Sequence, residues 1–218
     1  MNNTKPLAGL VIIAILGISM TARAENSRWG GYLGAAYVSF DTDVTAYAGG
    51  IEVSGGNADT TNNIGLAFGV TYDISPQWVA KLALGLPMTT KLTGVGALES
   101  AGELGKVSYG PAILSVSHYF NTNSMVKPYL GVGYNYTLIT DTEDGFISEF
   151  EVNDATGAVL VAGLKAMISN RLELIIDINK VFLKTTATGT LPAMGGARAD
   201  ADIRLNPTIT TVGLRTHF

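Results

Sequence analysis

The last ten residues, Ile209 to Phe218, restrict the fold of this chain more than any other segment. Every second residue from Thr210 to Phe218 lies on one face of a strand, and the charged or titratable residues Arg215 and His217 lie on the other. An amphipathic edge strand of a soluble protein has this pattern. The closing strand of an outer-membrane barrel has it too, because that strand pairs with the first and ends on an aromatic residue at the membrane interface. Other segments have to separate these two interpretations.

The first 24 residues predict the compartment. A secretory signal peptide typically has a basic residue, an apolar run and a cleavage site with small residues, which here are Lys5, Leu7 to Ile18, and Ala22 with Ala24. The apolar run is shorter than a transmembrane helix requires. We therefore expect a signal peptide at residues 1–24 and a single domain at residues 25–218. That domain has 18 acidic and 12 basic residues, which argues against a nucleic-acid partner.

Composition favours a membrane protein built from strands. The chain has no cysteine, 26 glycines and 7 prolines, and its mean hydropathy is +0.27. After the signal peptide, no apolar run reaches the length of a membrane helix. A barrel has this profile because only every second residue of each strand faces lipid.

Alternation with a period of two marks eight strands. In the clearest of them, Ile64 to Tyr72, large apolar residues occupy every second position and Gly, Ala and Thr lie between them. Short turns are expected at 74–76, 121–126 and 169–171, and long polar loops at 41–61, 87–106, 141–156 and 186–201. Short turns that alternate with long loops are typical of an outer-membrane barrel and not of a soluble sandwich.

The sequence therefore predicts an all-β fold, an eight-stranded antiparallel up-and-down transmembrane barrel in the outer membrane of a Gram-negative bacterium. Its outer surface would contact membrane lipid and lipopolysaccharide. Phe218, the last residue of the closing strand, is expected to be needed for insertion by the barrel-assembly machinery.

Strand parity points several ionisable side chains into the lumen. An eight-stranded barrel is narrow enough to be filled by its own side chains, and charges enclosed there have to be paired. One interpretation is a selectivity filter for ions. The interpretation that we favour is a structural ionic plug in the periplasmic half, which would block a straight pore. The predicted plug consists of Lys81, Lys165, Glu173, Asp177, Arg215 and His217.

Two prolines lie near the outer ends of the third and fourth strands. Pro87 follows the third strand and Pro111 lies in the outer half of the fourth, and each removes one backbone donor from the ladder between them. In lipid such a gap is costly unless it is used or covered. One hypothesis is a lateral opening in the barrel wall, and the other is a simple strand end above the lipid surface. The opening would be lined by Pro87, Met88, Tyr109 and Pro111.

The motifs do not indicate an enzyme or a cofactor site. Both histidines, His118 and His217, map to periplasmic strand ends, and Ser115 and Ser117 have the opposite parity to His118. The acidic segment 141–145 lacks the remaining ligand spacing of a calcium loop. We therefore expect no catalytic residue, no metal site and no cofactor.

Three segments resemble the OmpW family, and in particular its AlkL-type branch, which is linked to uptake of alkanes and other hydrophobic compounds. They are Val107–Ser115 (VSYGPAILS), Lys127–Gly133 (KPYLGVG) and Ile203–Pro207 (IRLNP), followed by a terminal aromatic residue. The resemblance covers essentially all of the chain after the signal peptide. It implies an eight-stranded barrel that passes small apolar molecules from outside into the outer membrane through a side opening.

The resemblance also implies a lumen constricted by large apolar side chains that point inward. The matching positions are about Ala83 and Asn179, and neither side chain is large and apolar. The constriction is therefore expected to be wider, wetter or formed by other residues such as Ile175, Val181 and Leu183.

Functions of different classes remain open. The first is a passive outer-membrane transporter for small hydrophobic molecules, which lipopolysaccharide keeps away from the acyl layer. The alternative is a structural or surface-recognition barrel with a closed lumen, whose long loops bind an extracellular partner. Conduction of ions through a narrow pore is a third.

Overall fold

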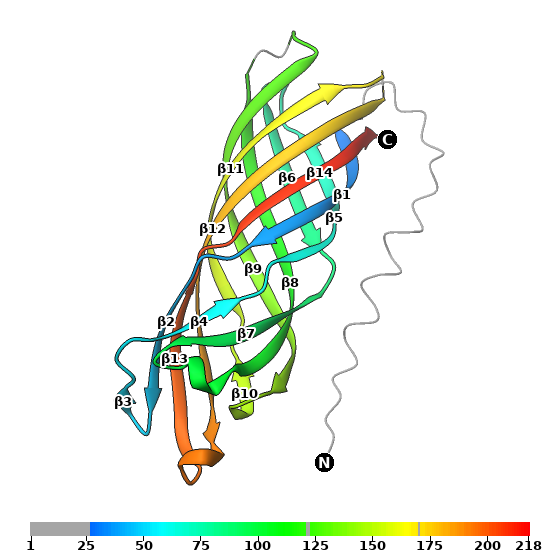
Figure 1. Ribbon diagram of the computed structural model, residues 1–218. Coiled ribbons are helices and arrows are strands. Elements are labelled where there is room, and N and C mark those ends of the chain that lie inside the picture. The colour runs from blue at the N-terminus through cyan, green and yellow to red at the C-terminus, as the bar shows by residue number, and fades with distance from the viewer. Residues whose placement is uncertain (1–26, 121–122, 170) are drawn as a thin grey trace.

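The computed structural model describes residues 27–120, 123–169 and 171–218 (Figure 1). The predicted signal peptide, residues 1–24, lies outside these ranges. In the described ranges, no helix is long and apolar enough to span a membrane. The helical segments are two short 3-10 helices, η1 (Glu99–Ala101) and η2 (Pro192–Met194), and most other described residues belong to strands.

Eight antiparallel strands close into a barrel within the described residues, which confirms the predicted fold. Each strand pairs with the barrel strand that precedes it in the chain, and the eighth pairs with the first. The strands are β1 (Trp29–Ser39), β5 (Asn63–Asp73), β6 (Trp78–Gly85), β8 (Glu103–Tyr119), β9 (Val126–Asp144), β11 (Ala155–Met167), β12 (Leu172–Leu191) and β14 (Thr208–His217).

The last ten residues form the closing strand. β14 pairs with β1 from Gly30–His217 to Ser39–Thr208 without a register shift. The backbone N–H of Phe218 donates to the Trp29 carbonyl at 3.3 Å, so the ladder continues to the final residue. The closed ladder leaves no edge of the barrel facing lipid, as a spanning sheet requires.

The four segments expected to be long polar loops are largely strands, so that part of the prediction was wrong. They extend the wall beyond one end of the barrel, as the lower half of Figure 1 shows. β8, β9 and β12 continue into this extension, and six further strands complete it. These are β2 (Thr42–Ala48), β3 (Ile51–Glu52), β4 (Gly56–Thr60), β7 (Met88–Gly96), β10 (Ser148–Val152) and β13 (Ala197–Leu205).

The extension has its own apolar core, which explains why its strands form. Val44, Leu92, Leu104, Phe150 and Ile203 are buried inside it and alternate with polar residues that face water. Because Asp, Thr and Gly dominate these segments, the alternation is easily mistaken for a polar loop. Burying such a row of apolar side chains stabilises strands that β-propensity alone would not.

The outer face of the barrel carries an apolar belt between aromatic residues. On the periplasmic side, the ring of Trp29 lies 4.9 Å from that of Tyr72, and the His118 ring lies 4.9 Å from Trp78 and 4.8 Å from Phe120. Toward the extension, the exposed aromatic side chains are those of Tyr37, Tyr134, Tyr136 and Phe182. Aromatic girdles of this kind mark the two membrane interfaces.

Candidate functional site: the barrel lumen and its wall

Arg215 is the centre of an ion cluster inside the periplasmic half of the barrel. Its side chain is 1% exposed and donates three hydrogen bonds, to Thr71 Oγ1 (2.8 Å), Glu173 Oε2 (2.8 Å) and Asp73 Oδ1 (2.7 Å). Lys165 Nζ lies 2.9 Å from the other oxygen of Glu173. The guanidinium group therefore holds two carboxylates from strands that flank β14, Glu173 of the neighbouring β12 and Asp73 of β5 beyond β1.

A second layer of the ion cluster lies nearer the middle of the barrel. Lys81 Nζ contacts Asp177 Oδ1 at 2.7 Å, and the Tyr129 hydroxyl donates to the same oxygen at 2.6 Å. Tyr129 stacks on Tyr119 with ring centroids 4.6 Å apart, and Lys165 Nζ lies 4.9 Å from the centroid of the Tyr119 ring. Both layers are thus filled by protein side chains that satisfy one another.

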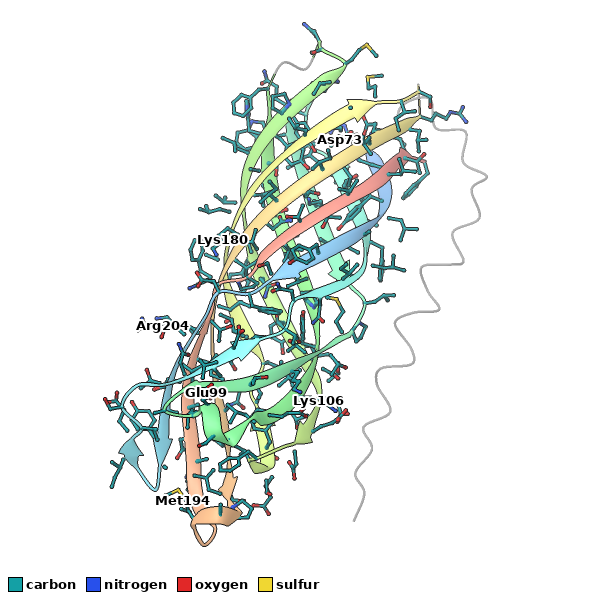
Figure 2. All side chains as sticks on the ribbon, in the orientation of Figure 1. Asp73, Glu99, Lys106, Lys180, Met194 and Arg204 are labelled. Carbon is teal, nitrogen blue, oxygen red and sulfur yellow. The ribbon has the colours of Figure 1, made fainter. Side chains whose placement is uncertain are left out.

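The structure brings all six residues of the predicted plug into this cluster. His217 joins it through Asp73, whose Oδ2 lies 3.0 Å from the imidazole Nε2. Sequence reasoning did not include Asp73 and Tyr129, although the parity of Asp73 in β5 already pointed it inward. Figure 2 shows Asp73 near the end of the barrel opposite the extension. With Asp73 included, three carboxylates face the basic side chains of Lys81, Lys165 and Arg215.

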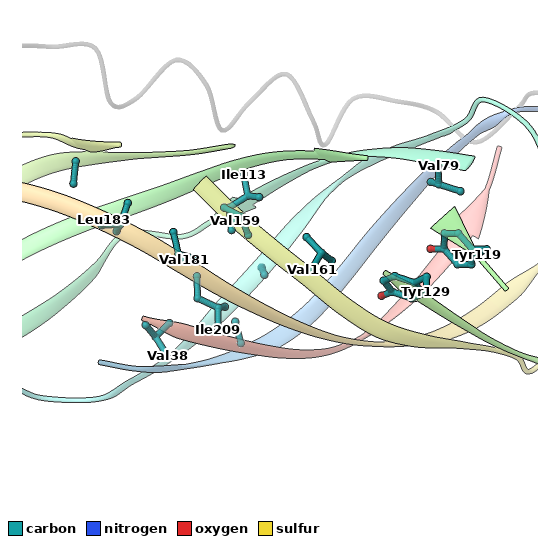
Figure 3. Packing of buried hydrophobic residues seen from close by; sticks show 13 residues of the cluster. Val38, Val79, Ile113, Tyr119, Tyr129, Val159, Val161, Val181, Leu183 and Ile209 are labelled. Carbon is teal, nitrogen blue, oxygen red and sulfur yellow. The ribbon is translucent and has the colours of Figure 1, made fainter. Parts of the chain in front are cut away.

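An apolar gallery lies between the ion cluster and the extension. It is a cavity of about 60 Å³, walled by Val38, Val181, Leu183 and Ile209, with the Tyr109 ring against Phe40 at 5.9 Å between centroids. Figure 3 shows Val38, Val181 and Ile209 gathered in the interior, with Tyr119 and Tyr129 together farther along the barrel. An apolar molecule in the gallery would meet few polar groups.

The residues expected to form a constriction all point inward but lie at different depths. Val181 and Leu183 line the gallery, and Val181 is fully buried. Ala83 and Asn179 lie deeper, where Asn179 Oδ1 has no hydrogen-bond partner among the described residues. Ile175 is buried farther along β12, between Glu173 and Asp177 of the ion cluster.

The extension encloses a larger apolar vestibule. Its volume of about 370 Å³ falls in the range of small-molecule pockets, and its walls include Leu98, Phe146 and Leu191. The vestibule and the gallery share Leu92 and Ile203 as lining residues. Apolar side chains therefore line the interior from the vestibule through the gallery to the ion cluster.

The backbone ladder is interrupted at two places beside the gallery, and the first coincides with the two prolines. β6 pairs with β8 as far as Leu84–Ala112, and β7 resumes the pairing with β8 at Met88–Tyr109, so Pro87 lies in the skipped segment. The third and fourth barrel strands are thus joined on both sides of the prolines. On the other side of this segment, β5 pairs with β6 only as far as Ala67–Gly85.

A second interruption lies between β5 and β7. Leu66 still accepts a hydrogen bond from the Leu86 N–H, and Thr61 N–H donates to Lys91 O. Between these points no ladder pair joins described residues 63–65 to residues 88–90, a stretch of roughly 10 Å. Side chains cross it instead, because the Asn63 amide hydrogen-bonds with the Tyr109 hydroxyl and Met88 covers Gly65.

A small side pocket of about 30 Å³ lies at this interruption. It shares Val38, Pro111 and Ile209 with the gallery, and its wall also includes Met88. Leu66 and Leu84, which have outward parity in β5 and β6, line it as well. Lys81 and Asp177 of the ion cluster line it too, so the side pocket lies between the ion cluster and the wall at the interruption.

Comparisons with known proteins agree on one family. The model of the OmpW family matches residues 33–218. The dibenzothiophene metabolism operon protein PahQ of Pseudomonas aeruginosa is 34% identical over 89% of this chain and 90% of its own. Outer membrane protein AlkL of Ectopseudomonas oleovorans is 30% identical over 97% of this chain and 96% of its own.

A solved structure shows the same fold. The crystal structure of the outer membrane protein OprG from Pseudomonas aeruginosa has a TM-score of 0.80 and 23% identity, and the match covers 87% of this chain and 95% of that one. The family match, the near-complete relatives and the closed barrel point to one conclusion. This chain is an outer-membrane protein of the OmpW family.

Proposed function

We propose that the protein is a passive channel for small hydrophobic molecules, which it releases sideways into the outer membrane. The observation that carries the proposal is that the vestibule and the gallery share apolar lining residues, and that the gallery shares others with the side pocket at the β5–β7 interruption. The ion cluster occupies the lumen on the periplasmic side of the gallery, and its Lys81–Asp177 pair also lines the side pocket. The name of PahQ, a relative from a dibenzothiophene metabolism operon, supports an apolar aromatic solute.

The side exit suits the energetics of an apolar solute. Going straight through the barrel would require it to displace paired charges in the ion cluster, which are costly to separate in a buried site. Going sideways requires it to displace Met88, whose flexible thioether adapts its shape more readily than other apolar side chains. The acyl layer outside is as apolar as the solute, so release there needs no cofactor, no energy source and no catalytic group.

Passage requires side chains to move, because the gallery is small. Its volume of about 60 Å³ is less than half of the roughly 150 Å³ of an apolar cavity that binds benzene, so a medium-chain alkane needs more space. The atoms that must move to widen the gallery are those of side chains and not of the backbone. Filling the gallery permanently should therefore slow transport.

Val181→Phe tests the gallery. The larger ring would occupy the cavity, and a solute would have to push it aside against an overpacking cost of about 2 kcal/mol. Uptake of a medium-chain alkane or ester by proteoliposomes should then be at least about tenfold slower. Ile178→Phe, on the lipid face of the same strand, is the matched control and should leave the rate unchanged.

Two results would contradict this proposal. Equal uptake by Val181→Phe and wild type, with both folded, would show that the gallery is not on the route. Uptake by wild type no faster than by empty vesicles, for every apolar solute tried, would favour the surface-recognition barrel with a closed lumen.

We also propose that Phe218 is the residue through which the barrel-assembly machinery handles the closing strand. Its ring would lie 3.4 Å from a Cβ placed at Gly31, so it packs over the β1–β14 seam. Phe218→Ala should lower the amount of heat-modifiable folded protein in the outer membrane and leave export unchanged. Normal accumulation of folded Phe218→Ala would show that the terminal ring is dispensable. Phe120→Ala, an exposed aromatic residue of the same interface, is the control.

A further inference from the structure

Two exposed cations face each other on the outside of the extension. Lys184 of β12 and Arg204 of β13 are directly opposite in the antiparallel register, and both are exposed. Like charges in this position are about 5 Å apart at Cβ and destabilise a sheet. Figure 2 shows Arg204 projecting away from the ribbon at the junction between barrel and extension.

These two cations differ from the other basic residues of the extension. Lys91 lies 2.7 Å from Glu103, and Lys106 lies 2.7 Å from Glu143. The hydrogen bond from Lys91 lowers the pKa of Glu103, and the hydrogen bond to Glu143 raises the pKa of Lys106. Arg198 is likewise paired with Asp200.

Lys184 and Arg204, by contrast, form no ion pair with any residue that the structure describes. Arg204 is in register with Asp43 on its other side, yet no nitrogen–oxygen distance of 4.0 Å or less joins them. An anion from outside the chain would offset the repulsion between the two cations.

Lys184 and Arg204 line a polar groove of about 570 Å³, which also contains the carboxylate of Asp154, the acceptor for the Tyr136 hydroxyl. Asp43, Asp202 and Asn153 line it with hydrogen-bonding groups, and Tyr47 adds an aromatic ring. The mixture of cations, carboxylates and an amide matches a ligand that has both an anionic group and several hydroxyl groups, because carboxylates accept from hydroxyls while Lys and Arg donate to anions.

The height of the groove identifies where such a ligand would come from. Phe182, an exposed aromatic residue of the outer girdle, is two positions below Lys184 on the same face of β12. Lys184 and Arg204 therefore stand just above the apolar belt, at the level of lipid head groups. In the outer leaflet of this membrane those head groups are the phosphorylated, acidic sugars of lipopolysaccharide.

We propose that this groove is a binding site for the acidic sugar head group of lipopolysaccharide. Lys184 and Arg204 hold its phosphate or carboxylate, and Asp43, Asp202 and Asn153 bond its hydroxyls. The site lies on the outer face of the wall and is independent of transport through the lumen. It would fix the depth and the rotation of the barrel in the outer leaflet.

The test compares two double variants that each remove two positive charges. Lys184→Gln/Arg204→Gln removes the unpaired cations, and Lys91→Gln/Lys106→Gln removes paired ones and serves as the matched control. Each protein is refolded into phosphatidylcholine nanodiscs, checked by heat modifiability, and titrated with a lipopolysaccharide that retains lipid A and the acidic inner core. The first variant should bind at least about tenfold more weakly than wild type, and the second should bind like wild type.

Three further results are informative. Equal binding by wild type and the Lys184→Gln/Arg204→Gln variant would overturn the proposal. Phosphatidylglycerol is titrated in the same way. If it binds wild type with the same affinity as lipopolysaccharide, and the Lys184→Gln/Arg204→Gln variant loses this binding, the groove makes a general contact with anionic lipid and the sugar assignment is overturned. Inorganic phosphate at millimolar concentration should fail to displace lipopolysaccharide, and displacement would show a site for phosphate alone.

Discussion

A disulfide that joins β5 to β7 is expected to abolish uptake of apolar solutes, and its reduction is expected to restore uptake. The pair is Gly65→Cys with Met88→Cys. A Cβ at position 65 would lie 3.1 Å from Cγ of Met88, near the roughly 3 Å between one Cβ and the partner's sulfur in a disulfide. The bond would bridge the interruption and remove the flexible side chain that covers it. The measurement is the uptake rate of a medium-chain alkane by proteoliposomes, oxidised against reduced, with the cross-link verified by mass.

The control for this experiment uses the other neighbour of Met88. Met88→Cys with Tyr109→Cys joins β7 to β8, which are already paired in register at these residues. Its oxidation should leave uptake unchanged. If this second bond abolished uptake and the first did not, the exit would lie between the third and fourth barrel strands, where the two prolines first suggested it. If neither bond altered uptake, the solute would not leave through this wall.

The ion cluster is expected to make the largest single contribution to stability among the charged groups of the barrel. Arg215→Met would leave Glu173 and Asp73 without the cation that binds both, and breaking a buried ion pair on one side costs about 3–5 kcal/mol. The check is unfolding by urea in detergent or lipid vesicles. Glu173→Ala should be destabilising in the same direction by about 3 kcal/mol, because it leaves Lys165 without its carboxylate.

Lys106→Met is the matched control for Arg215→Met. It removes one cation from an ion pair of similar length, Lys106–Glu143 at 2.7 Å, whose two side chains are exposed. Water can solvate the remaining carboxylate, so the midpoint of unfolding should not change. A small effect of Arg215→Met, equal to that of the control, would mean that the interior of the periplasmic half is hydrated rather than dry.

Sequence alone predicted which side chains enter the lumen, because the period of a strand is fixed. Lys165 and Glu173 were both assigned to the interior from parity, with no knowledge that they come within 2.9 Å of each other. Parity cannot say which residues on different strands share a level. The sequence therefore does not indicate Asp73 as a partner of Arg215, because their contact depends on the register of β5, β1 and β14 together.

Two other features could not be read from local patterns. The strands of the extension carry many Asp, Thr and Gly residues. The apolar residues that alternate with them indicate strands only once their contacts in one core are known, such as that of Phe150 and Leu104. The prolines indicated the short skip in the ladder beside β8, which the structure contains. The second interruption, between β5 and β7, was not predicted, because it arises from β4 pairing with β7 while β5 stops short, and local sequence does not show which distant segments share hydrogen bonds.

The length of the strands bears on how the density of the sugar layer affects the uptake of apolar solutes. β9 and β12 contain 19 and 20 residues, about twice the 9–11 that a tilted strand needs to cross a bilayer. The mouth of the vestibule thus stands well outside the hydrocarbon. A solute captured there would skip the layer of charged sugars whatever the density of that layer. On the proposed route, a cell with such a protein could make the sugar layer below the vestibule mouth denser against detergents and still admit oily nutrients.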